Sequence, residues 1–152
     1  TQAPWWRCRR GWAWALDMLQ AMNTGHEGSL TTLHANSPRD ALMRLETLVL
    51  MAGDSLPLAA IRDQVASAVD IIVQQTRFAC GARKVTAIAE VCGMEGGRIQ
   101  IQEIFRFNRA ARRDGGAVAG HFTACDCIPA FYETLRERGE LLALDDFQRS
   151  AS

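Results

Sequence analysis

The chain has 152 residues, of which 48% are hydrophobic and 22% are charged, as in ordinary globular proteins. Lys and Arg together number 17, as do Asp and Glu, so no overall field attracts nucleic acid or anionic lipid. No apolar run approaches the ~20 residues of a membrane-spanning helix, and the N-terminal residues contain no clear signal-peptide cleavage site. These totals predict one domain with its own core.

The basic side chains are nearly all Arg, with Lys84 as the single Lys. A P-loop grips phosphate with Gly-Lys-Ser or Gly-Lys-Thr, and because neither occurs, this chain contains no complete P-loop. The first residue is Thr1 rather than Met, so we expect a fragment or a processed product.

The first predicted element is a helix over residues 13–22, where apolar residues have helical spacing and Gly25 is a suitable C-terminal stop. Residues 29–34 are Thr-rich and bounded by Gly28 and Asn36, a pattern that favours a short strand.

A second helix is predicted to begin at Ser37, which can cap it, with Pro38 in the first helical position and Asp40 near the positive end of the helix dipole. Gly53 closes this helix, and a third helix is predicted over residues 57–68. The apolar stripes that predict the core faces of the two helices contain Leu42, Leu45, Val49, Ile61 and Val65.

Three strands are predicted next, over residues 70–77, 83–91 and 98–107, and the first two are joined by a turn at residues 80–82. Ile104 interrupts the alternation of apolar and polar residues in the last strand, which indicates a bulge there. The three strands together predict an antiparallel meander.

The composition changes after Asn108. Residues 109–120 are charged and Gly-rich, which predicts a linker or long loop. Residues 128–139 predict a short amphipathic helix with Pro129 at its start and Gly139 as its stop.

Three stretches carry a recognisable pattern: ALDMLQAMNTGHEGSLTTLHANSPRDALMRLETLVLMAG, AIRDQVASAVDIIVQQTR and RKVTAIAEVCGMEGGRIQIQEIFRF. Together they closely resemble the CpaF/TadA secretion ATPases of the type II/type IV secretion ATPase superfamily, over about residues 15–107. The segment NTGHEGSLTTLHANSP looks like that family's His box, and residues 128–139 look like its C-terminal end.

The resemblance implies an α/β fold, namely the C-terminal half of a RecA-like P-loop ATPase domain with an antiparallel β-meander and a small helical C-terminal tail. It implies a hexameric enzyme that uses ATP and Mg²⁺ to drive assembly of Flp-type (tight-adherence) pili or type II/IV secretion. The implied partners are the other subunits of a homo-hexamer and platform proteins of the inner membrane, with no specific nucleic acid. The implied location is cytoplasmic, peripheral at the inner membrane through the platform proteins.

This chain also departs from the family's pattern before the first predicted helix. The family's P-loop, Asp-rich box and Walker B Gly-Glu would precede the first helix, and none is present; four Trp residues lie between residues 5 and 14 instead. We interpret residues 1–14 as an aberrant junction or a diverged segment in place of the Walker B region. Residues 15–108 would be the C-terminal part of the RecA-like domain with the His box, and residues 109–152 a linker and helical tail.

The resemblance assigns the site to the His box. Ligands of parallel α/β sheets bind at the carboxyl ends of strands, so His34, at the end of the predicted strand, would reach the γ-phosphate of ATP and sense the nucleotide state. Gly25 and Thr32 are expected near the same phosphate, with Thr32 positioning His34. We expect His26 to order the preceding loop. The alternative for His34 is a solvated loop residue with no such role.

A metal site formed by His26, Glu27 and His34 is disfavoured, because a strand of this length would separate the two imidazoles by roughly 20 Å. The irregular spacing of the cysteines does not fit zinc, and reduced thiols that fill small gaps are expected instead. The five cysteines are Cys8, Cys80, Cys92, Cys125 and Cys127.

Two other functions stay open at the level of sequence. One is a non-catalytic oligomerisation or platform-binding module, favoured by the missing P-loop; the other is a type IV secretion ATPase that moves protein or DNA. Arg77, Arg83 and Lys84 flank the turn of the first hairpin, where they keep the hairpin soluble or contact a neighbouring subunit.

Overall fold

The structure of the chain is a computed structural model that describes residues 13–25, 28–52, 55–110, 118–140 and 142–149. It divides into two compact units, each described here by itself. The first comprises Thr1–Val69 with Gly93–Ile99, and the second comprises Asp70–Cys92 with Gln100–Ser152.

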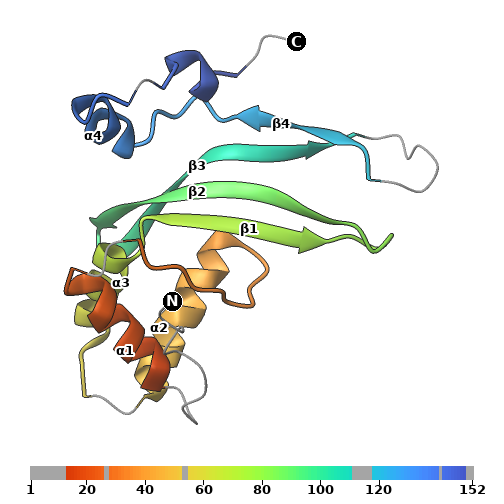
Figure 1. Cartoon of the computed structure of the whole chain (residues 1–152). Helices are drawn as coiled ribbons and strands as arrows, with labels where there is room; N and C mark the ends of the chain where they lie inside the picture. The colour runs from red at the N-terminus through yellow and green to blue at the C-terminus, as the bar shows by residue number, and fades with distance from the viewer. Residues whose placement is uncertain (1–12, 26–27, 53–54, 111–117, 141, 150–152) are drawn as a thin grey trace, which may run out of the picture. The chain divides into compact units, whose positions relative to one another are not determined.

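Three helices form the first unit (Figure 1): α1 (Ala13–Asn23), α2 (Pro38–Met51) and α3 (Leu58–Ala68). Each packs against the other two, and all three confirm the predicted helices. Their shared core contains Ala15, Leu19, Leu42, Leu45, Val49, Ile61 and Val65, which include the two stripes expected from the sequence. No helix among the described residues is long and apolar enough to cross a membrane.

The ends of these helices follow their local sequence signals. The Ser37 hydroxyl accepts a hydrogen bond from the backbone N–H of Asp40 at 3.1 Å, and Pro38 occupies the first helical position, as predicted. Gly25 follows α1 with φ at 91°, a left-handed conformation that glycine adopts without a steric penalty. The start signal of α2 and the stop signal after α1 are therefore confirmed, whereas Gly53, the stop expected for α2, lies outside the described residues.

The predicted strand over residues 29–34 is wrong, because this segment has no regular secondary structure. Leu30 is 88% exposed, so no apolar face is buried there. A Thr-rich pattern supplies only a preference, and a strand forms where another strand pairs with it and one face is covered. His34 therefore precedes α2 directly and does not lie at the carboxyl end of a strand.

Hydrogen bonds of the Arg62 side chain also hold the first unit together. Arg62 on α3 donates from Nε to Glu46 on α2 at 3.1 Å and from a terminal nitrogen to the carbonyl oxygen of Gly97 at 3.0 Å. Gly97 lies in the turn between strands β2 (Arg83–Glu95) and β3 (Arg98–Arg109), and the tip of this hairpin belongs to the first unit. Arg62 thus connects two helices and a turn that are distant in sequence.

The sheet has four strands in the order β1-β2-β3-β4, and the pairs β1–β2 and β3–β4 are antiparallel. The strands are β1 (Ile71–Arg77), β2 (Arg83–Glu95), β3 (Arg98–Arg109) and β4 (Gly120–Ala124). The predicted three-strand meander is confirmed. The pairing of β1 with β2 shifts register between Gln74 and Gln75. The bulge expected at Ile104 stays a prediction.

Ile104 of β3 is 1% exposed and packs with Tyr132 and Phe147. These two residues belong to α4 (Phe131–Glu137) and to the 3-10 helix η1 (Leu144–Phe147). The helix predicted over residues 128–139 is confirmed, whereas β4 and η1 were not predicted. The second unit thus has its own small core, built between the sheet and the C-terminal elements.

Candidate functional site

The candidate site from the sequence is the surface around His34. His34 is exposed and lines a pocket of ≈ 410 Å³ together with Ala35, Asn36, Asp40 and Arg44. Asp40 and Arg44 lie four residues apart on α2, so their side chains share one face of the helix. The predicted site residue therefore lies at a pocket, although the strand expected to deliver it is absent.

The pocket combines three kinds of polar group beside a helix start. The N-terminus of α2, capped by Ser37, carries a partial positive charge, and the Arg44 guanidinium adds a full one. The His34 imidazole can donate or accept a hydrogen bond, whereas the Asp40 carboxylate favours a cation. The arrangement suits an anion that is accompanied by a positive ion.

The other predicted site residues are not brought to this pocket. Thr32 is exposed in the irregular segment, and Gly25 follows α1; neither residue lines the pocket around His34. His26 and Glu27 lie outside the described residues, so their expected roles stay predictions. Asp40 and Arg44 are the lining residues that sequence reasoning did not assign to the site, and their four-residue spacing after the cap was the available signal.

Glu90 is a buried carboxylate that sequence reasoning also missed. It is 5% exposed and accepts hydrogen bonds from Gln102 Nε2 at 2.6 Å and from the backbone N–H groups of Ala130 at 3.0 Å and Phe131 at 3.4 Å. The last two groups are at the start of α4, where a helix has N–H groups without a partner of its own. Glu90 therefore has a structural role, anchoring α4 to the sheet.

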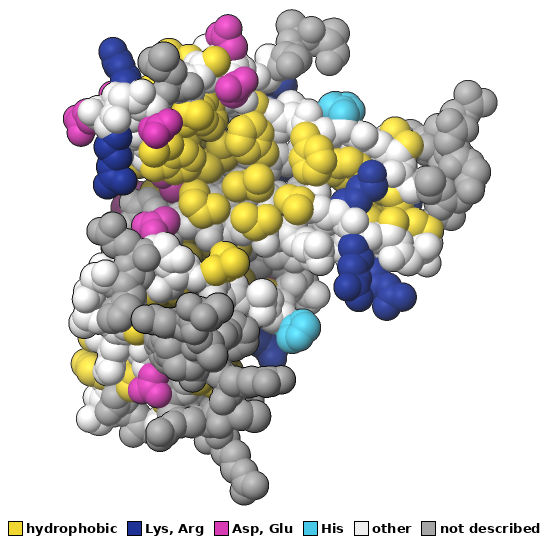
Figure 2. All heavy atoms as spheres, in the orientation of Figure 1, with side chains coloured by type: hydrophobic (Ala, Val, Ile, Leu, Met, Phe, Trp, Pro, Cys, Tyr) yellow, Lys and Arg dark blue, Asp and Glu magenta, His cyan; other side chains and the backbone are white. Residues whose placement is uncertain are grey.

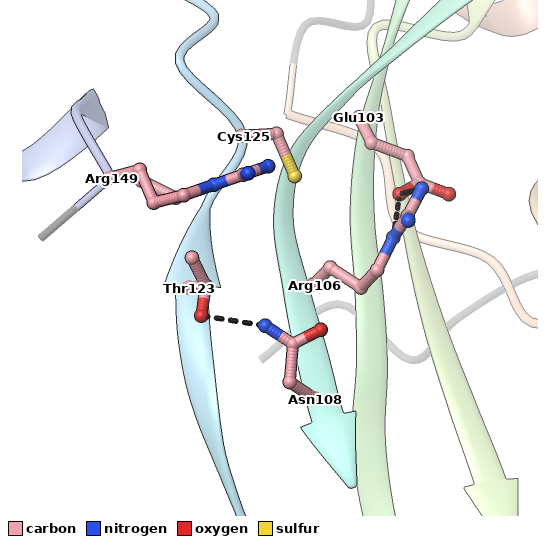
Figure 3. Close-up of a pocket in the computed structure, with 7 residues that line it drawn as sticks. Glu103, Arg106, Asn108, Thr123, Cys125 and Arg149 are labelled. Carbon is pink, nitrogen blue, oxygen red and sulfur yellow. Dashed lines mark hydrogen bonds and ion pairs between the residues drawn. The ribbon is translucent and has the colours of Figure 1, made fainter. Parts of the chain in front are cut away.

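A second pocket, of ≈ 230 Å³, lies on the β3–β4 side of the second unit (Figure 3). Arg106 bonds Glu103 through Nε at 2.6 Å, which raises the pKa of the guanidinium, and Asn108 donates to the Thr123 hydroxyl at 2.7 Å. Arg149, also at the pocket, has its Nε 3.7 Å from Asp126. Both cations already face carboxylates, so this pocket is a less favourable anion site.

The thiols differ from the expectation that they fill small gaps. Cys80 and Cys92 are exposed, which makes that prediction wrong for these two, whereas Cys125 and Cys127 are partly buried. Cys8 lies outside the described residues. Desolvation by burial, followed by the nearby Glu103, raises the pKa of the Cys125 thiol, so this group stays protonated at neutral pH.

Comparison with known proteins places the chain in a class. Residues 13–145 match the family of type II/IV secretion system proteins. The matched region contains all the described helices and strands except the end of η1. The chain therefore belongs to this family.

Three relatives illustrate the match. The chain is 36% identical to Rv3659c of Mycobacterium tuberculosis, whose name assigns it to conjugal transfer, over 103 residues that make up 68% of this chain and 28% of the relative. It is 40% identical to the conjugal transfer protein TrbB of Rhizobium radiobacter over 84 residues, 55% of this chain and 24% of the relative. It is 42% identical to the type IV secretion system protein PtlH of Bordetella pertussis over 74 residues, 46% of this chain and 22% of the relative.

The chain thus spans about a quarter of the length of these relatives. The resemblance to the wider secretion superfamily is confirmed. None of the three names refers to Flp-type pili, so the narrower CpaF/TadA assignment is a matter of proposal.

Proposed function

We propose that this chain is the nucleotide-responsive C-terminal portion of an ATPase that powers secretion. The observation that carries the proposal is the position of His34, exposed at a pocket with Arg44 and Asp40 beside the capped start of α2. The family match supports the class of the machine, and the pocket supports the role of this portion within it.

The residues at the pocket fit one edge of a bound nucleotide. Arg44 and the start of α2 would attract a terminal phosphate, and the imidazole of His34 would exchange a hydrogen bond with it. Asp40 would face Mg²⁺, which binds few carboxylates together with phosphate oxygens. ATP and Mg²⁺ would supply the phosphoryl chemistry, while His34 reports whether the phosphate is present.

The main grip on the phosphates must come from other parts of the polypeptide. The chain contains no Gly-Lys-Ser or Gly-Lys-Thr and no Walker B Gly-Glu before α1. A hexamer of the complete enzyme would then pass the response on to platform proteins at the inner membrane.

Two processes are candidates for the work that the complete ATPase drives. The sequence pattern over about residues 15–107 resembles the ATPases of Flp-type pilus assembly. The names of the three relatives favour the alternative, conjugal or type IV secretion, in which the cargo is protein or DNA. The coarser proposal, an ATPase portion that serves secretion, is common to both.

A non-catalytic oligomerisation or platform-binding module is the second candidate. The missing P-loop favours it for the 152 residues taken literally. The genomic DNA upstream of the Thr1 codon separates the two candidates. A P-loop and a Gly-Glu strand upstream, in frame or in a shifted frame, would support the ATPase portion, and a start codon directly at Thr1 would support the module.

A His34→Ala substitution in the protein that carries the upstream half tests the site. We expect Mg²⁺-dependent ATP hydrolysis to fall by about 10²-fold, comparable to the loss of one group that stabilises charge at a phosphate. His121→Ala is the matched control, because His121 is exposed on β4 in the other unit. This variant should hydrolyse ATP at the rate of the unmodified protein. Equal hydrolysis by the His34→Ala variant and the unmodified protein would reject the role of this imidazole.

A further inference from the structure

The end of the β1–β2 hairpin carries two arginines directly opposite each other. Arg77 on β1 is the cross-strand partner of Arg83 on β2, so both side chains lie on the same face of the hairpin, and both are exposed. Lys84, the next residue of β2, lies on the opposite face, where its Nζ is 5.1 Å from the ring centroid of Phe107. The arginine pair therefore consists of Arg77 and Arg83 alone.

The arginine pair has no opposite charge beside it. Directly opposite residues have Cβ atoms about 5 Å apart, and like charges at such positions destabilise the pairing of the strands. In the part of the chain that the structure describes, no salt bridge includes either arginine. A carboxylate from a partner would relieve this repulsion, because the planar guanidinium can bind a carboxylate through two parallel hydrogen bonds. The arginine pair is therefore suited to an acidic partner.

The C-terminal elements of the same unit supply an excess of acidic residues. Residues 131–149, which include α4 and η1, contain five acidic and three basic residues. Arg136 already faces Glu133 at 3.6 Å. Arg149 already faces Asp126 at 3.7 Å. Four exposed carboxylates of this stretch take part in none of the salt bridges among the described residues, and we call them the acidic group: Glu137, Glu140, Asp145 and Asp146.

The acidic group lies far from the arginine pair of its own chain. Glu90, the cross-strand partner of Ile71, accepts hydrogen bonds from the backbone N–H groups of Ala130 and Phe131 at the start of α4. α4 is thus held at the Ile71 end of β1, whereas Arg77 is at the other end, roughly 20 Å away at ~3.3 Å per residue. Figure 1 shows α4 and the β1–β2 turn at opposite ends of the sheet, and Figure 2 shows Asp and Glu side chains around α4 and Lys and Arg side chains at the turn.

We propose that the acidic group of a second copy of this chain binds the arginine pair. A second copy fits this role because one unit carries the two charges at opposite ends, where neither can satisfy the other within one molecule. The contact joins two different surfaces, so it repeats head to tail from copy to copy. It goes beyond the function proposed above, because it uses no residue of the pocket around His34, and either can fail while the other stands.

Sedimentation velocity of the purified chain at two salt concentrations tests the proposal. At about 50 mM salt, where the Debye length is roughly 14 Å, the weight-average mass should rise above the 16.8 kDa of the monomer as the protein concentration increases. At about 500 mM salt the Debye length falls to roughly 4 Å, and the mass should return to that of the monomer. The series extends to about 1 mM protein, because exposed ion pairs each contribute little to affinity.

Charge reversal identifies the two surfaces. The first variant, Arg77→Glu with Arg83→Glu, places like charges in the contact and should stay monomeric at the lower salt concentration. An equimolar mixture of this variant with a second one should associate again, because the acidic group of the first variant then meets the arginine pair of the second. The second variant reverses the acidic group and should be monomeric alone: Glu137→Lys, Glu140→Lys, Asp145→Lys and Asp146→Lys.

Arg39→Glu with Arg98→Glu is the matched control for the first variant, because it changes the net charge equally at exposed positions outside the contact. This control should associate as the unmodified chain does. Circular dichroism confirms that each variant is folded. If a charge-reversal variant is not folded, Arg83→Gln and Glu140→Gln replace it, and each should weaken association by about 2- to 5-fold, the range of one exposed ion pair.

A monomeric unmodified chain at the lower salt concentration would overturn the proposal. Association that persists at the higher salt concentration would also overturn it, since such a contact would be apolar rather than electrostatic. An equal loss of association in the Arg39→Glu, Arg98→Glu control would reduce the effect to one of net charge. A mixture of the two variants that stays monomeric would show that the acidic group is not the surface that meets the arginine pair.

Discussion

Glu90 shows what a single buried carboxylate does in the second unit. Glu90→Ala removes the acceptor for Gln102 and for two backbone N–H groups at the start of α4, and leaves these donors without a partner. We expect the free energy of unfolding to fall by about 3 kcal/mol, measured by urea denaturation followed by circular dichroism. Glu137→Ala, on an exposed position of α4, should change it by less than about 0.5 kcal/mol. A similar effect of both variants would contradict the anchoring role.

A partly buried thiol provides a second prediction at the scale of a single residue, which concerns its rate of alkylation. Desolvation by burial, followed by the nearby Glu90 carboxylate, raises the pKa of the partly buried Cys127 thiol. A raised pKa leaves less thiolate at any pH below it, and the thiolate is the form that reacts. At pH 8 we therefore expect iodoacetamide to alkylate Cys127 more slowly in the folded chain than in 6 M urea, as followed by mass spectrometry of the peptide that contains this residue. Equal rates in the two states would contradict the raised pKa.

At the scale of elements, β4 depends on a close approach that only glycine permits. A Cβ added at Gly120 would lie 2.6 Å from Cζ of Phe107 and would overlap the carbonyl oxygen of Asn108. Gly120→Ala should therefore disturb the pairing of β4 with β3 and destabilise the second unit by about 1–3 kcal/mol, measured by urea denaturation. His121→Ala, at the exposed position that follows Gly120, is the matched control and should leave the stability unchanged. An unchanged free energy of unfolding for Gly120→Ala would contradict the prediction that β4 needs glycine at this position to pair with β3.

The same elements show which parts of the fold the sequence could predict. The three helices of the first unit were predicted because their signals are local: Ser37 caps α2, and apolar stripes recur at helical spacing. The strand expected over residues 29–34 did not form, and β4 was missed, since pairing depends on partners that the local pattern does not contain. Of the site, the sequence predicted His34, while Arg44 joined it only through the geometry of α2.

At the scale of the whole molecule, the proposed function gives this chain one edge of a nucleotide site without the centre of that site. His34, Asp40 and Arg44 can contact a phosphate and its metal ion, but no Lys follows a Gly here to hold the β- and γ-phosphates. We therefore expect the purified 152-residue chain to show no Mg²⁺-dependent release of phosphate from ATP above that of a heat-denatured sample. Turnover that His34→Ala abolishes would contradict this expectation, because it would mean that these residues form a complete catalytic site without the P-loop.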